Sequence, residues 1–260
     1  MTMQKKNAIS IEKEVSQQFY LDTYEDGFVA LTLRNVAMVE AFISYDSNYL
    51  RTENEDAKKT NSFPGSTAFW MSLLRRHLLE GEVSPEGESY DSILSNAVEA
   101  VDRENSTHLN ADKIGRDELP RRLLAIEKDT LLKMLKTPAP DYELIKILSE
   151  KTHAKKGRVN YSFATKFCHY ACMTLFKGTE QQDNFSIYDN IVSKAIPAYI
   201  YHFKLNKRDF NPKDYSSYIG MIDKIRQASG SGISRNGFDH LLWYFYKGHP
   251  ELIERPKSIQ

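Results

Sequence analysis

The sequence predicts an all-α protein, and three observations support that prediction. Apolar residues recur at helical spacing in almost every segment, as in VALTLRNVAMVEAFISY at residues 29–45. No segment shows the sustained apolar–polar alternation of a half-buried strand. Most prolines and glycines fall between the periodic segments, where they end helices and begin turns.

The predicted helices follow one another along the chain, and several have a recognisable start or stop. Polar caps begin three of them: a Ser/Thr cap at the start of the helix at 67–80, Asp141 and Asp189. Gly230 is expected to end one helix, and Pro197 is expected to bend another. After 29–45, the expected helices are 67–80, 91–103, 121–136, 141–153, 162–176, 190–205, 214–230 and 234–248. A polar connection with Gly115 and Pro120 is expected before residue 121.

Composition excludes several classes of protein. No apolar run reaches the roughly 18 residues that a membrane-spanning helix needs, and the first 18 residues do not form a secretory signal. We therefore expect a cytoplasmic protein without a membrane partner. The only cysteines, Cys168 and Cys172, are too few for a disulfide framework or a four-thiolate cluster, so two reduced core thiols are expected. The seven histidines are scattered, so no metal site and no cofactor are expected.

The zero formal net charge conceals a basic stretch. Residues 151–208 contain ten lysines and arginines and three acidic residues, which gives +7 and leaves −7 for the rest of the chain. Such a stretch favours a surface for a polyanion, although a solvated helix face explains isolated charges equally well.

Two charged residues stand out in this basic stretch. On a helix over 162–176, the apolar side chains share one stripe, and Lys166 lies on the other side with Ser162, His169 and Tyr170. Asp189 follows 23 residues later, at the expected start of the next helix. Without further context, Lys166 is expected to be a solvated lysine and Asp189 an ordinary helix cap.

The order of these elements resembles the helix–hairpin–helix DNA glycosylases, the superfamily of endonuclease III and 8-oxoguanine DNA glycosylase. The resemblance covers about residues 141–200. In that family a hairpin leads into a helix with a nucleophilic lysine, and a catalytic aspartate begins a later helix. Lys166 in SFATKF and Asp189 in FSIYDNIV occupy these positions. The hairpin, KKGRVNYS, has one glycine where the family often has Gly-x-Gly, and the cysteines of the endonuclease III branch are absent.

The resemblance implies an architecture and a substrate. It implies two helical subdomains flanking a cleft, an acidic one at residues 1–140 that carries base recognition and a helix–hairpin–helix catalytic one at 141–260. The partner would be double-stranded DNA with a damaged or modified base, bound by a monomer. The SFATK and IYD segments also resemble uncharacterised bacterial proteins, some of them associated with defence against phage that carry modified bases. Base excision in DNA repair and anti-phage defence are therefore both open.

The chemistry explains why these two residue types matter. A glycosylase acts on a flipped-out nucleotide, and a carboxylate stabilises the positive charge left on the sugar as the base departs. Asp189 is the candidate for that role. A neutral lysine amine can attack C1′ and form a Schiff base, which permits strand cleavage as an AP lyase. Lys166 is the candidate nucleophile; without it, the enzyme would be a monofunctional glycosylase that uses water.

Further residues are candidates for DNA and base contacts. The base pocket needs stacking and hydrogen-bonding groups, for which His169, Tyr170 and Phe238 are candidates, although most aromatic residues belong to the core. The hairpin and the start of the next helix should contact phosphates, through the candidates Lys155, Lys156, Gly157, Arg158, Asn160 and Ser162.

Two alternatives come from other classes of protein. One is a non-catalytic helix–hairpin–helix module that binds DNA. The other is a helical protein-interaction domain whose basic stretch meets an acidic partner.

Overall fold

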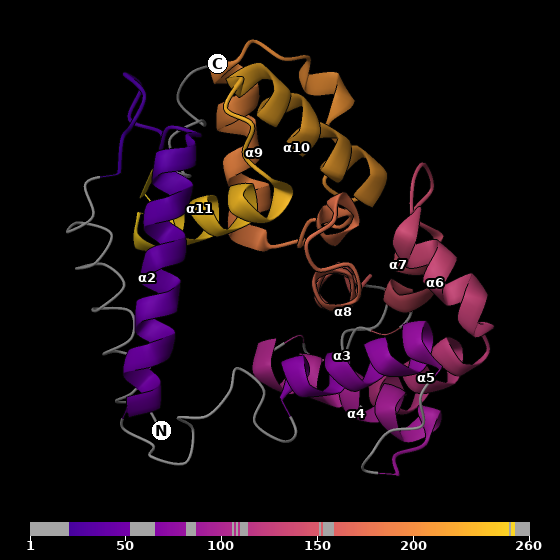
Figure 1. Cartoon of the computed structure of the whole chain (residues 1–260). Coiled ribbons are helices and arrows are strands. Elements are labelled where there is room, and N and C mark those ends of the chain that lie inside the picture. The colour runs from indigo at the N-terminus through magenta and orange to yellow at the C-terminus, as the bar shows by residue number, and fades with distance from the viewer. Residues whose placement is uncertain are drawn as a thin grey trace. The chain divides into compact units, whose positions relative to one another are not determined.

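A computed structural model describes residues 21–52, 66–81, 87–105, 107, 109, 114–150, 152, 159–249 and 251–252. Within these ranges the protein is all-α, as predicted, apart from one isolated antiparallel bridge between Thr23 and Val29. No helix in the described ranges is both long and apolar enough to cross a membrane. The α-helices are α2 (Leu33–Thr52), α3 (Thr67–Arg75), α4 (Tyr90–Asn105), α5 (Ile114–Leu124), α6 (Lys128–Lys136), α7 (Glu143–Ser149), α8 (Tyr161–Leu175), α9 (Asn190–His202), α10 (Tyr215–Ser229) and α11 (Arg235–Gly248) (Figure 1).

The chain forms two compact units, and their limits differ from the predicted boundary between residues 140 and 141. Unit 1 combines residues 1–53 with residues 189–260, and unit 2 holds residues 54–188. The physical reason is that α2 packs against α11, so the early helix belongs with the end of the chain.

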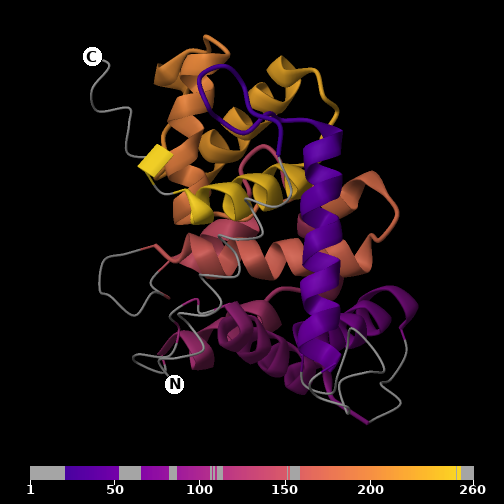
Figure 2. The same ribbon diagram turned by 90° about the vertical axis from the view of Figure 1, so that its left-hand side faces the viewer.

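Unit 1 is built around α11, which contacts α2, α9 and α10 (Figures 1 and 2). Its centre contains Tyr199 and Tyr246, whose hydroxyl oxygens lie 2.9 Å apart. The Tyr199 hydroxyl also lies 2.9 Å from the carbonyl of Val29, so it ties the segment before α2 to α9. Burial raises the pKa of the Tyr199 hydroxyl well above its usual value, and the nearby Tyr246 adds to this effect.

Unit 2 is built around α8, which contacts α3, α4, α6 and α7. The predicted apolar stripe is buried and includes Phe163, Phe167, Cys168 and Cys172. Neither thiol forms a disulfide, and burial raises the pKa of both. The two cysteines therefore serve as small apolar core residues.

The structure corrects three predicted elements of unit 2. The connection expected around Gly115 and Pro120 is the helix α5, and the single helix expected at 121–136 is divided between α5 and α6. A Cβ atom at Gly115 would lie 2.9 Å from the side chain of Leu109 and 2.9 Å from the carbonyl of Thr152, so this glycine permits close packing and is not a helix stop.

The predicted cap of α7 is also different. Tyr142, and not Asp141, is the N-cap, with a left-handed backbone at φ 49°. No side-chain hydrogen bond caps this helix, whereas Ser66, Asp189, Asp214 and Ser234 cap other helices through their side chains.

Candidate functional site

The helix that carries Lys166 begins at Asn160, whose side chain and backbone both form hydrogen bonds within unit 2. The side-chain oxygen of Asn160 accepts the backbone N–H of Phe163 at 3.1 Å and so caps α8. Its amide nitrogen donates to the carbonyl of Thr107 at 3.1 Å, and its backbone N–H donates to Ser149 at the end of α7 at 2.9 Å. Asn160 is only 1% exposed. The structure therefore gives Asn160 a capping role inside the unit in place of the predicted phosphate contact.

The rest of the predicted hairpin lies mostly outside the described residues. This applies to Lys155, Lys156, Gly157 and Arg158. Ser162 is half-buried in the first turn of α8. Helices α7 and α8 pack together, and the Asn160–Ser149 hydrogen bond joins the two ends of the connection between them.

Lys166 lies on the side of α8 that faces the end of α4. It is half-buried, and its ammonium nitrogen donates to the carbonyl oxygen of Asn105 at 3.3 Å. The hydroxyl of Tyr170, one turn further along, donates to the side-chain oxygen of Asn105 at 2.8 Å. Asn105 is the last residue of α4, where unpaired carbonyls and the helix dipole attract a cation. Lys166 thus lies opposite the apolar stripe, as predicted, whereas its contact with α4 was not predicted.

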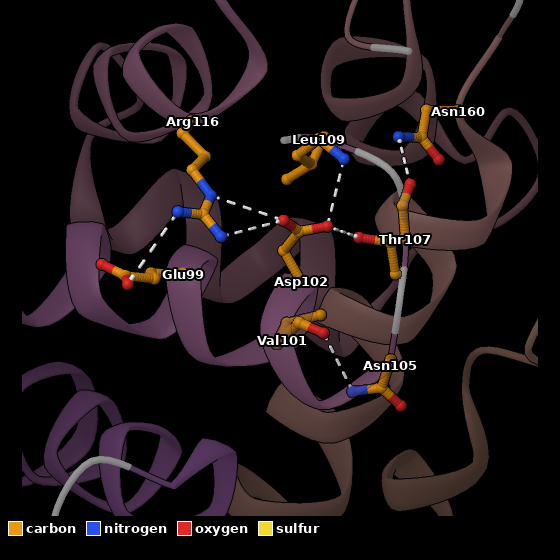
Figure 3. A network of polar contacts seen from close by, with 8 residues as sticks. All are labelled: Glu99, Val101, Asp102, Asn105, Thr107, Leu109, Arg116 and Asn160. Atoms are coloured by element: carbon orange, nitrogen blue, oxygen red, sulfur yellow. Dashed lines mark hydrogen bonds and ion pairs between the residues drawn. The ribbon is translucent and has the colours of Figure 1, made fainter. Parts of the chain in front are cut away.

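A buried network joins Asp102 of α4 to Thr107, Leu109 and Arg116 (Figure 3). Asp102 is 2% exposed, and one of its carboxylate oxygens accepts the Thr107 hydroxyl at 2.6 Å and the Leu109 backbone N–H at 3.1 Å. The other oxygen faces the guanidinium of Arg116, at 3.3 Å from Nη2. Thr107 in turn accepts from Asn160. The network thus connects α4, α5 and the cap of α8.

This network could not be predicted from local sequence patterns. Asp102 and Arg116 lie 14 residues apart on two helices, and no periodicity or motif joins them. Helical periodicity gave no signal of the burial of Asp102 either, because at 100° per residue this side chain falls beside Asp91 and Ser95, away from the centre of the apolar face.

The predicted base-pocket residues are distributed over both units, with His169 and Tyr170 in unit 2 and Phe238 in unit 1. His169 is 3% exposed, and its Nδ1 lies 3.1 Å from the carbonyl of Phe185; since a carbonyl only accepts, Nδ1 carries the proton. Phe238 is fully buried in unit 1, edge-on to Tyr199. Tyr170 is half-buried and belongs to the Lys166 cluster described above. Each of these residues is explained by packing within its own unit.

Asp189 is the N-cap of α9, as predicted. One carboxylate oxygen accepts the backbone N–H of Ile191 at 2.6 Å, and the residue is half-buried. Tyr218, fully buried in the same unit, has a pKa raised well above the usual value by burial and by nearby charges that include Asp239 and Asp189. Asp189 therefore has a fixed direction beside a buried hydroxyl. Lys166 belongs to unit 2 and Asp189 to unit 1.

Comparisons of this chain with models of protein families, with curated proteins and with solved structures each gave no match.

Proposed function

We propose that this protein is a DNA glycosylase that removes a damaged or modified base from a flipped-out nucleotide in duplex DNA, with an associated AP lyase activity. The observation that carries the proposal is the setting of Lys166. A lysine that is half-buried and held by the carbonyl of Asn105 has a defined direction, whereas a solvated lysine samples many. A nucleophile must be positioned before it can attack C1′, and for the attack the Lys166 amine must lose its proton and leave the Asn105 carbonyl. The biological context would be base excision in repair or in defence against modified foreign DNA.

Asp189 supplies the second requirement of the chemistry. Its capping bond to Ile191 uses one carboxylate oxygen and fixes the other. A fixed carboxylate stabilises positive charge on the sugar more strongly than one that must reorganise. The proposal requires Lys166 and Asp189 to act on the same nucleotide, which kinetic coupling between variants would reveal.

The decisive experiment is borohydride trapping on duplex DNA with an abasic site. Wild type should form a covalent adduct, and Lys166→Ala should not. Lys166→Arg is the sharper variant, because arginine keeps the charge and can still donate to the Asn105 carbonyl but forms no Schiff base. Lys177→Ala, an exposed lysine just after α8, is the matched control and should trap like wild type. Equal trapping by wild type and Lys166→Arg would refute the lyase role.

Base release should depend on the carboxylate of Asp189. Asn at this position still caps a helix but carries no charge, so Asp189→Asn tests chemistry with the cap retained. We expect a loss of at least 100-fold in base release, on the order of the effect of one electrostatic or acid–base group.

One observation favours a second candidate, the non-catalytic DNA-binding module. The Lys166–Asn105 bond gives the lysine a structural role at the end of α4, which would by itself account for its place. In that case Lys166→Arg and Asp189→Asn would both keep full DNA affinity, and wild type would show neither trapping nor base release.

A further inference from the structure

A cluster of exposed cations lies at the far end of α9 from Asp189. Lys204, Lys207 and Arg208 are exposed, and none of them forms an ion pair with a residue in the described ranges. Tyr201, one turn before them, is 71% exposed, which is unusual for so large an aromatic side chain. We call Tyr201, Lys204, Lys207 and Arg208 the α9 patch.

Four other cations in the described part of unit 1 do form ion pairs. Arg34 pairs with Asp22 at 2.5 Å, and Lys224 pairs with Asp209 at 2.6 Å. Arg226 and Arg235 share Asp223.

Asp209 follows the patch directly, yet it does not neutralise the patch. One of its oxygens binds Lys224, and the other accepts from the side chain of Asn206 at 3.0 Å. Asp209 is therefore already committed to other partners, and no ion pair with a described residue compensates the positive charge of the patch.

The backbone under the patch is ordered by specific bonds. Lys204 has a left-handed backbone at φ 53°, a conformation that costs a non-glycine residue about 1 kcal/mol or more. The N–H of Leu205 donates to the carbonyl of Ile200 at 2.8 Å, which closes the end of α9 around Lys204. The side chain of Asn206 then accepts the N–H of Arg208 at 3.1 Å.

We infer that the α9 patch is a contact surface for the phosphate backbone of DNA. Lys and Arg side chains bind phosphates, and a tyrosine hydroxyl is also a common phosphate donor. This inference rests on the proposed function and extends it, because it gives unit 1 a DNA contact separate from the predicted hairpin. The 13 residues of α9 extend for about 20 Å at 1.5 Å per residue. The patch would therefore reach phosphates within about six base pairs of a nucleotide at Asp189, at about 3.4 Å per step.

The first test compares two variants with equal charge change. The patch variant is Lys204→Gly, Lys207→Ala and Arg208→Ala, with glycine at 204 because that residue tolerates the left-handed backbone. The control is Arg121→Ala, Lys133→Ala and Lys136→Ala, three exposed cations of unit 2. Affinity for a plain 30-base-pair duplex is measured from 50 to 300 mM salt. Three lost phosphate contacts should flatten the slope of log affinity against log salt by about 2.7, and the control should change it by less than about 1.

The second test locates the contact. The duplexes carry an abasic site either ten or three base pairs from one end, and the shortened arm lies on one side of the site or on the other. The affinity of wild type should change when the arm on one of these two sides is shortened from ten to three base pairs. The patch variant should be insensitive to that shortening. The inference would be overturned if the patch variant kept the salt slope of wild type. It would also be overturned if the patch variant lost binding to a polyglutamate chain but kept its affinity for DNA. Trapping by Lys166 is read separately, so the patch and the catalytic proposal fail independently.

Discussion

Removing the carboxylate of Asp102 should destabilise unit 2 more than any exposed change. In Asp102→Ala, the hydroxyl of Thr107 and the N–H of Leu109 lose their acceptor while both remain at 1% exposure. An unsatisfied buried donor costs about 1 to 3 kcal/mol, which places the pair at roughly 2 to 6 kcal/mol. The side chain of Arg116 is 30% exposed, so water recovers part of its lost ion pair. We therefore expect a total loss of about 4 kcal/mol, near the range for broken buried ion pairs.

Asp102→Asn separates the hydrogen bonds of this carboxylate from its ion pair with Arg116. Thr107 and Leu109 bind the same carboxylate oxygen, which an asparagine can reproduce, while its NH2 group would face Arg116. The expected loss is about 2 kcal/mol, the value of a hydrogen bond to a charged group.

The assay is urea unfolding followed by tryptophan fluorescence. Trp70 lies in unit 2 and Trp243 in unit 1, so a Trp243→Phe background reports on unit 2 alone. Asp141→Asn, an exposed acid in the same unit, is the control and should stay within about 0.5 kcal/mol. A loss below about 1 kcal/mol in Asp102→Ala would show that the network does not contribute as its geometry indicates.

Three further predictions concern unit 1. Gly237→Ala should cost about 1 to 2 kcal/mol by overpacking, because the new Cβ would lie 2.9 Å from Val36, and adding Val36→Ala should recover part of the loss in thermal unfolding. Burial opposes protonation of His240, but the hydrogen bond and charge of Glu40, with the charge of Asp239, outweigh it and raise its pKa above 6.5. The protonated His240 therefore stabilises the fold fully below pH 6.5, and this stabilisation is lost as pH rises through the raised folded-state pKa. The melting temperature of wild type should fall accordingly between pH 5.5 and 8.5, and a Glu40→Gln variant should lack this fall. Asp189→Ala should lose about 1 kcal/mol of unfolding free energy and Asp189→Asn only a few tenths, measured through Trp243, and equal losses would contradict the capping role.

The sequence predicted the local features of this fold well, because caps and apolar stripes are encoded within a few residues. The cap at Asp189, the stop at Gly230 and the buried stripe of α8 all depend on neighbours within one or two turns. The helix at 29–45 is shifted to Leu33–Thr52 because Asn35 reaches back to the carbonyls of Asp22 and Ala30, and this holds the preceding residues extended.

Long-range features were beyond local patterns. The position of Lys166 opposite the apolar stripe followed from helical periodicity, but its contact with Asn105 joins residues 61 apart. Asn160 is a candidate phosphate contact by its place in the hairpin, whereas the structure uses its hydrogen-bonding groups in a buried helix cap. The division into units depends on α2 meeting α11, which no local spacing reveals.

The two-segment construction of unit 1 has a consequence for protein synthesis. Glu40 on α2 and His240 on α11 are in contact although they lie 200 residues apart in the chain. At ribosomal rates of about 5 to 20 residues per second, α2 leaves the ribosome roughly 10 to 40 s before its partner helix exists. Unit 2 emerges in between and holds all of its own helices, so it can fold first. During that interval the apolar face of α2, with Val39 and Phe42, stays uncovered, and this makes the nascent chain a client for chaperones that shield exposed apolar surface.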